Sequence, residues 1–251
     1  MATPTRDREL WIQRFPAEGR SGTRLVCFPH AGGSASFYFP LSQALAADTE
    51  VLAVQYPGRQ DRRKEVPVED IQLLADHIAD ALDGRPELPT AYFGHSMGAV
   101  VAFEVARRLE RRGNGPALLF ASGRRAPSTH REESVHQRDD DGVIDELKRL
   151  NGTDARVLAD DELLRMILPA IRGDYRAIET YRCPPGPKLG CPVTVLVGDA
   201  DPRTTLDEAH AWSTHTTGRF DLRVFPGGHF YLSTHPEAVT ETVAAGLATL
   251  V

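Results

Sequence analysis

Few folds can accommodate the segment AYFGHSMGAVVAFEVA, residues 91–106. Its first residues, 91–93, predict a short buried strand, and the mostly apolar stretch after Gly98 predicts a helix. The two are joined by Gly94-His95-Ser96-Met97-Gly98, which has the pattern G-x-S-x-G. Between a strand and a helix, this pattern predicts a sharp, strained turn that holds Ser96 at the carboxyl end of the strand. Bulkier residues in place of the two glycines would collide with the neighbouring strand and helix.

Strands and helices alternate along most of the remaining chain. Helix patterns with one apolar face occur at residues 37–45, 71–82 and 239–247, and Ser34 or Ser36 is a candidate cap for the first of them. The alternation predicts an α/β fold with a mostly parallel central sheet flanked by helices, and sites at the carboxyl ends of the strands. Short apolar runs place the strands at residues 25–28, 51–55, 91–93, 117–121, 193–197 and 222–225.

The alternation is interrupted between residues 127 and 187, where no strand pattern is convincing. Helix patterns occupy this stretch, and Pro169 predicts a break or kink in one of them. We interpret residues 127–187 as a helical lid inserted into an α/β core made of residues 1–126 and 188–251. Ordinary packing helices are the alternative interpretation.

Composition narrows the classes of function. A chain of 251 residues with 41% hydrophobic and 25% charged residues can form one large α/β domain. Its net charge of −6 disfavours nucleic acid and an anionic membrane as partners. The three cysteines have no metal-ligand or redox spacing, which fits a reducing compartment. Because no signal peptide and no membrane-spanning run are visible, we predict a cytoplasmic protein.

Ser96 is the candidate nucleophile. Its hydroxyl would lie near a helix N-terminus, where free N–H groups and the helix dipole favour developing negative charge. A serine hydroxyl is a poor nucleophile near neutral pH, so it needs an adjacent base and a group that orients this base. Among nine histidines, His229 fits best because its Gly-Gly-His-Phe loop follows the last predicted strand. His95, inside the turn, is expected to point away and to be structural.

The orienting acid is expected after an earlier strand, where Gly198-Asp-Ala-Asp-Pro202 offers two aspartates. We favour Asp201, because it lies deeper in the loop and Pro202 biases its backbone towards an extended conformation. Asp199 would then cap or brace the turn. The chain order of Ser96, Asp201 and His229 is that of α/β-hydrolases.

A tetrahedral intermediate at Ser96 would also need hydrogen-bond donors for its oxyanion. One candidate is the backbone N–H of Met97, the residue after the nucleophile. The other should come from the glycine loop His30-Ala-Gly-Gly33, after the first strong strand, where we nominate the backbone N–H of Ala31. The alternative for these glycines is a simple tight turn.

Several motifs taken together resemble those of type II thioesterases, the stand-alone editing hydrolases of polyketide and non-ribosomal peptide synthesis. The resemblance runs from about Trp11 to the C-terminus, and no catalytic position departs from it. The motifs are FPHAGGS (28–34), QYPGR (55–59), GHSMG (94–98), SGRRAP (122–127), GDADP (198–202) and GGHF (227–230).

The resemblance implies an α/β-hydrolase fold with a helical lid. It implies hydrolysis of acyl thioesters on the 4′-phosphopantetheine arm of acyl or peptidyl carrier proteins, with removal of aberrant acyl groups that stall a synthase. No metal and no cofactor are implied, apart from the arm that the substrate carries. We expect a monomer. The alternatives are an acyltransferase or cyclase with the same triad, a carrier-binding scaffold with a vestigial site, and a general carboxylesterase.

A carrier protein of acidic character would need a local basic patch on a protein of negative net charge. We propose Arg59, in the loop after the second strand, and Arg124 and Arg125, after the strand at 117–121, as candidates for substrate or carrier binding. Residues 62–64 are also basic, but a solvated face is the favoured interpretation there.

Overall fold

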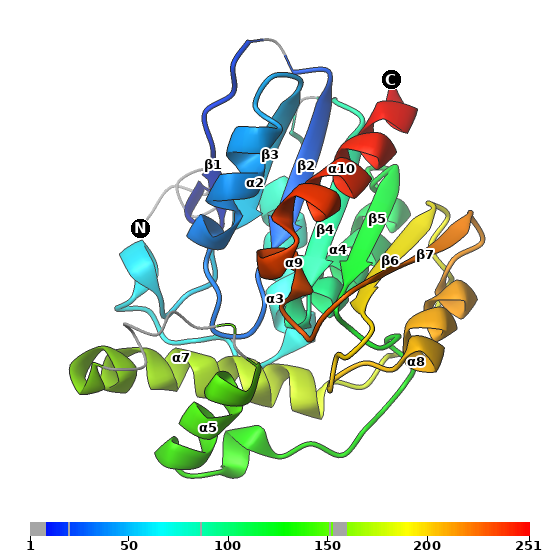
Figure 1. Ribbon diagram of the computed structural model, residues 1–251. Helices are drawn as coiled ribbons and strands as arrows, with labels where there is room; N and C mark the ends of the chain where they lie inside the picture. Colours follow the sequence, from blue (N-terminus) through cyan, green and yellow to red (C-terminus); the bar gives the residue numbers. More distant parts are fainter. Residues whose placement is uncertain (1–8, 20, 86, 151, 153–159) are drawn as a thin grey trace.

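The computed structural model describes residues 9–19, 21–85, 87–150, 152 and 160–251. Its centre is a seven-stranded sheet of order β1-β3-β2-β4-β5-β6-β7 (Figure 1). Every neighbouring pair is parallel except β1 and β3. The strands are β1 (Ile12–Arg14), β2 (Thr23–Phe28), β3 (Thr49–Val54), β4 (Thr90–His95), β5 (Leu118–Ser122), β6 (Val193–Gly198) and β7 (Phe220–Phe225). The predicted fold class is confirmed.

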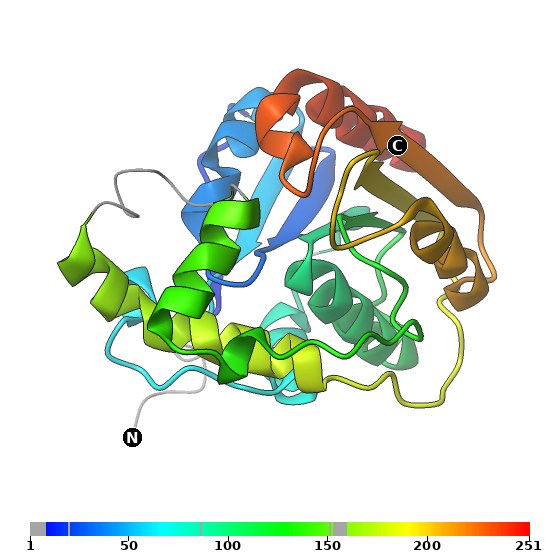
Figure 2. The same cartoon turned by 60° about the horizontal axis from the view of Figure 1, so that its bottom comes forward.

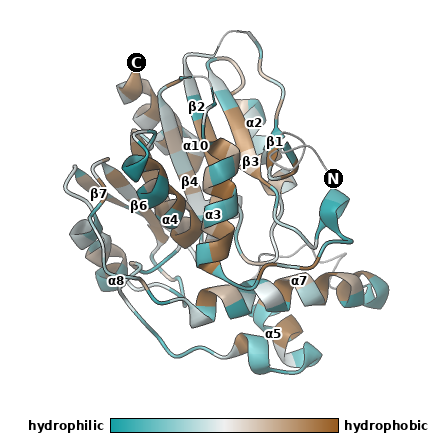
Figure 3. Ribbon diagram, turned by 180° about the vertical axis from the view of Figure 1, so that it is seen from behind, coloured by the Kyte–Doolittle hydropathy of each residue, from teal (hydrophilic) through white to brown (hydrophobic). Residues whose placement is uncertain are grey.

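Helices cover both faces of the sheet. One core cluster packs α3 and α4 against one face, and a second packs α2 and α10 against the other (Figures 1 and 3). No described helix is long and apolar enough to cross a membrane. The α-helices whose bounds lie within the described residues are α2 (Phe39–Ala44), α3 (Ile71–Leu82), α4 (Met97–Arg111), α5 (Asp140–Leu150), α7 (Asp161–Thr180), α8 (Leu206–His210), α9 (Tyr231–Thr234) and α10 (Pro236–Leu247).

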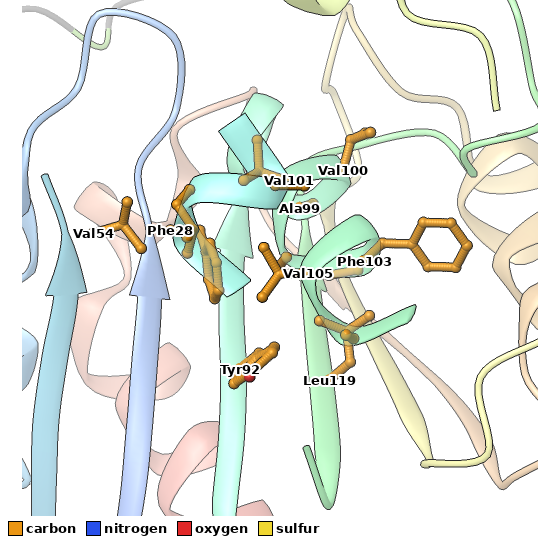
Figure 4. Close-up of a cluster of buried hydrophobic side chains, with 14 of the residues drawn as sticks. Phe28, Val54, Tyr92, Ala99, Val100, Val101, Phe103, Val105 and Leu119 are labelled. Carbon is orange, nitrogen blue, oxygen red and sulfur yellow. The ribbon is translucent and has the colours of Figure 1, made fainter. Parts of the chain in front are cut away.

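The sheet is buried on both faces, which explains the continuous apolar runs in the sequence. Alternate residues of β2 enter opposite clusters: Val26 and Phe28 join one, while Leu25 and Cys27 join the other. The close-up of the first cluster shows Phe28 and the side chains of α4 packed over the central strands (Figure 4). This packing holds the carboxyl ends of β2 and β4 side by side, where the predicted site lies.

The turn after β4 has the strained geometry that its sequence predicts. Ser96 has φ 54° and ψ −118°, in a region that residues with side chains rarely occupy. A Cβ atom on Gly94 would lie 2.2 Å from the carbonyl oxygen of Gly98. A Cβ atom on Gly98 would lie 2.0 Å from the carbonyl oxygen of Phe28. Both glycines are therefore required by close backbone contacts.

Two helices of the interrupted segment, α5 and α7, lie together beyond one end of the sheet (Figures 1 and 2). They share a small apolar cluster that includes Val143, Leu147, Leu168 and Ile171. The expected break at Pro169 does not occur. The helix α7 continues through this residue, from Asp161 to Thr180. The domain division at residues 127–187 stays a prediction.

Two local details differ from the sequence-based expectations. The short strand β1 was not predicted; it pairs antiparallel with β3 at the sheet edge. Neither Ser34 nor Ser36 caps a helix with its side chain. Both hydroxyls instead accept hydrogen bonds from the side-chain amide of Gln60, at 2.9 and 2.8 Å.

Substituting Gly98 with alanine tests the close contact at the turn. We expect Gly98→Ala to lower the free energy of unfolding by about 1–3 kcal/mol or more, because overpacking against backbone atoms cannot be relieved by rotating a side chain. Denaturant titration measures this change. As a control, Gly22→Ala should stay within about 0.5 kcal/mol, since Gly22 is exposed and an added Cβ would lie 3.6 Å from its nearest neighbour. Equal stabilities of the two variants would contradict the contact.

Candidate active site

A cavity of about 1010 Å³ lies between the carboxyl ends of the strands and the helices α5 and α7. Ser96 and His229 both line it, and Ser96 is partly exposed. The loops after β2 and β3 form part of the wall, and apolar side chains such as Leu147, Ile167 and Ile171 form another part. The space has the size of a typical small-molecule binding site.

The side chains of His229 and Asp201 form a buried pair. The Nδ1 atom of His229 lies 2.9 and 3.1 Å from the two carboxylate oxygens of Asp201. Asp201 also accepts a hydrogen bond from the backbone N–H of Arg203 at 2.8 Å. A carboxylate only accepts hydrogen bonds, so the neutral His229 ring carries its proton on Nδ1 and leaves Nε2 as the acceptor. This arrangement is suited to general-base chemistry.

Ser96 and His229 face one cavity, but the structure records no hydrogen bond between these two residues. Catalytic hydrogen bonds are often long before substrate binds, so this does not remove His229 as the candidate base. Asp199 contacts neither side chain: it accepts a hydrogen bond from the backbone N–H of Gly227 at 2.9 Å. Asp199 thus braces the loop that carries His229, as its alternative role predicted.

His95 is fully buried, and its Nδ1 lies 2.9 Å from the hydroxyl of Ser122. Burial, together with His229, lowers the pKa of His95 well below its usual value, so the ring is neutral. Its ring centroid is nevertheless 5.0 Å from that of His229. The residue is held by the fold as expected and does not line the cavity, although its ring lies next to that of His229.

The side chain of His30 was not predicted to belong to the site. It lines the cavity between the rings of Phe37 and Phe230, at centroid distances of 4.7 and 4.9 Å. Burial, followed by the charges of His229 and Arg59, lowers its pKa to about 3. Its place in the glycine loop after the first strong strand is the signal that could have identified it.

Neither of the two nominated oxyanion donors has a hydrogen-bond acceptor among the described residues. Met97 is the first residue of α4, so no carbonyl within that helix accepts its N–H. In the glycine loop, the N–H of Gly32 donates to Asp174 at 2.8 Å and that of Gly33 donates to His30 O at 2.9 Å. Among the described residues, none accepts a hydrogen bond from the N–H of Ala31. The role of both donors stays a prediction.

The predicted basic docking patch is wrong for Arg59, Arg124 and Arg125, because these side chains are buried. Arg59 forms a two-pronged ion pair with Asp174, and Arg125 is hydrogen-bonded to Glu133. Burial and the charge of Arg125 lower the pKa of Arg124 to about 9. Arg59 and Arg124 line the cavity, where they could contact a substrate but not the surface of a carrier domain.

The basic residues 62–64, which follow Arg59, differ from one another in exposure. Arg62 is buried, with its guanidinium 4.3 Å from the ring centre of Trp11. Arg63 and Lys64 are exposed, as a solvated face requires, and Arg63 also lines the cavity.

Comparisons with known proteins agree with this geometry. A family model described as a thioesterase domain matches residues 23–247. A protein of Streptomyces griseus, described as a probable cadicidin biosynthesis thioesterase, is 59% identical over 94% of this chain and 66% of its own length. Thioesterase PikA5 of Streptomyces venezuelae is 53% identical over 90% of this chain and 82% of its own length.

Solved structures give the same result. The type II thioesterase BorB from the borrelidin biosynthetic cluster has a TM-score of 0.89 and 52% identity, over 95% of this chain and 98% of its own. YbtT, a type II thioesterase from the yersiniabactin pathway, has a TM-score of 0.85 and 32% identity, over 96% of this chain and 99% of its own. The chain therefore belongs to the thioesterase family and groups with the type II thioesterases of polyketide and non-ribosomal peptide biosynthesis.

Proposed function

We propose that this thioesterase hydrolyses acyl groups from the 4′-phosphopantetheine arm of acyl or peptidyl carrier proteins and so removes aberrant acyl groups from a synthase. The observation that carries the chemistry is the buried His229–Asp201 pair, which shares one cavity with the strained Ser96. The substrate class rests on the similarity to type II thioesterases of synthase pathways.

In the first half-reaction, the oxygen of Ser96 attacks the thioester carbonyl carbon while Nε2 of His229 accepts the hydroxyl proton. The N–H groups of Ala31 and Met97 would hold the oxyanion of the tetrahedral intermediate, and Asp201 would stabilise the imidazolium. The carbon–sulfur bond then breaks, and the thiol leaves with the proton from His229. The acyl group remains on Ser96 as an ester.

In the second half-reaction, His229 takes a proton from water as the water oxygen attacks the ester carbonyl. Collapse of the second intermediate releases the carboxylic acid and returns the proton to Ser96. General-base catalysis of this kind contributes about 10²–10⁴-fold to the rate. The reaction requires no metal and no cofactor of the enzyme, which stays a prediction.

The helices of residues 127–187 would act as the lid of this site. Apolar side chains of α5 and α7, such as Leu147, Ile167 and Ile171, face the cavity and would contact the hydrocarbon part of the acyl group. The monomeric state and the cytoplasmic location stay predictions.

Replacing the nucleophile tests the reaction itself. With wild type, we expect free acid and free carrier thiol from acetyl- and longer acyl-carrier proteins. Ser96→Ala should lose the activity by several orders of magnitude and keep its fold, because it removes only the attacking oxygen. Single-turnover assays read by intact-protein mass would measure this. Transfer of the acyl group to an added alcohol or amine would favour an acyltransferase, and retention on the carrier would favour a binding protein.

Two aspartates of one loop provide a matched test of the acid. Asp201→Asn should lower kcat by about 10⁴-fold, because an amide no longer favours the Nδ1–H tautomer of His229. Asp199→Asn should change kcat by less than about tenfold, since its amide oxygen can still accept from Gly227. Steady-state kinetics with a small thioester would measure both. A larger loss for Asp199→Asn would contradict the assignment.

Arg63 is an exposed arginine that lines the cavity, and it is a further candidate for binding the arm. Arg63→Glu should raise KM for acyl-carrier substrates roughly threefold to tenfold at low salt, because the phosphate of the arm is anionic. Turnover of a small thioester without phosphate should change little. Arg111→Glu, an exposed charge at the far end of α4, is the control. The same KM rise with both substrates would argue against arm binding.

A further inference from the structure

One carboxylate of the helix α7 is bound to the glycine loop after β2. Asp174 is buried, and its Oδ2 atom accepts a hydrogen bond from the backbone N–H of Gly32 at 2.8 Å. The same carboxylate binds the guanidinium of Arg59, at 2.6 Å through Oδ2 and 2.9 Å through Oδ1. The lid helix thus contacts the residue next to Ala31, whose N–H is the nominated oxyanion donor.

The loop itself is a tight turn from His30 to Gly33. The N–H of Gly33 donates to the carbonyl of His30 at 2.9 Å, and Gly32 has φ +78°, as in a type II turn. In a trans peptide the carbonyl and the N–H point in opposite directions, so the His30 carbonyl bond aims the N–H of Ala31 away from the turn. The direction of this N–H therefore depends on the turn staying closed in its observed position.

Asp174 acts on the peptide that decides the turn type. Type I and type II turns differ chiefly by a flip of the central peptide, here the one between Ala31 and Gly32. Because glycine tolerates both conformations, the residue type alone does not prevent the flip. The Asp174 carboxylate accepts the N–H of this central peptide and favours the observed orientation. Ile171, one turn earlier on α7, lies where a side chain on Gly32 would be, at 2.9 Å.

We propose that Asp174 is a positioning residue for thioester hydrolysis, which anchors the 30–33 turn to α7 through the N–H of Gly32 and so holds the N–H of Ala31 in place for the oxyanion. The inference rests on the proposed function of Ser96 and Ala31. It makes α7 part of the oxyanion machinery as well as the cover of the cavity. Arg59 supports the same turn, since its Nη1 also donates to the carbonyl of Gly33 at 3.2 Å.

Single substitutions would confuse this role with the loss of a buried ion pair, because the remaining charge would lack a partner. Two double variants separate the effects. Arg59→Met with Asp174→Asn removes both charges but leaves an amide oxygen that can accept from Gly32. Arg59→Met with Asp174→Leu removes both charges and the acceptor, in a side chain of similar size. Thermal unfolding followed by circular dichroism would establish that both variants fold.

The two variants are compared in reactions at Ser96 that need the oxyanion donors. We expect the leucine double variant to have a kcat on a small thioester about 10²–10³-fold below that of the asparagine variant, with KM changed less than threefold. Labelling of Ser96 by a fluorophosphonate, whose phosphoryl oxygen needs the same donors, should slow in parallel. Equal rates for the two double variants, whether high or low, would overturn the inference. The labelling rates decide this even if wild type fails to hydrolyse acyl-carrier proteins, an outcome that would refute the proposed function alone.

Discussion

The close approach of Gly98 to the backbone at the end of β2 is the contact on which the geometry of the site depends. A single added carbon at Gly98 would lie 2.0 Å from the carbonyl oxygen of Phe28. Because Phe28 leads directly into the 30–33 turn, this contact determines where the amide of Ala31 lies relative to Ser96 and the start of α4. Gly94 closes the other side of the turn against the backbone of Gly98. Two positions without side chains therefore bring the candidate nucleophile and both candidate donors together at the carboxyl ends of β2 and β4.

Buried charges join the segment of residues 127–187 to the loops that follow the central strands. Arg203 lies two residues after Asp201, in the loop that follows β6. Its guanidinium binds Glu133 at 2.6 Å and also binds Glu146 of α5. Burial raises the pKa of Glu133, but hydrogen bonding to Arg125 and the nearby positive charges outweigh this and hold it at about 2. The ion pairs of Glu133 therefore stabilise the fold at pH values above the ordinary carboxyl pKa. This stabilisation is lost as the pH falls towards 2. Such pairs add little net stability compared with apolar packing, but separating them would leave a buried charge without its partner.

The parts of this structure that the sequence predicts are those set by local rules. The turn at Ser96 is predicted by two glycines, which are needed because the backbone comes into close contact there. The central strands are predicted by continuous apolar runs, because the sheet is buried on both faces. Strand β1 has no such pattern, because only Ile12 of its three residues is buried and its pairing with β3 is a tertiary contact. The exposure of Arg59 was misjudged for a similar reason. Its partner, Asp174, lies 115 residues further along the chain, on a helix whose position the sequence does not show.

The electrostatics of the three neighbouring histidines explain why only one of them suits the role of base. The rings of His30, His95 and His229 lie within a single cluster, with centroids 5.0 and 5.9 Å from that of His95. Burial is the main cause that lowers the pKa of His30 to about 3 and that of His95 well below its usual value. Both rings are therefore neutral near pH 7, and neither opposes the positive charge that His229 would acquire on taking the serine proton. Of the three rings, only that of His229 contacts a carboxylate, Asp201, which can balance this charge. Proton transfer from Ser96 would thus be favoured at His229 rather than at either neighbouring ring.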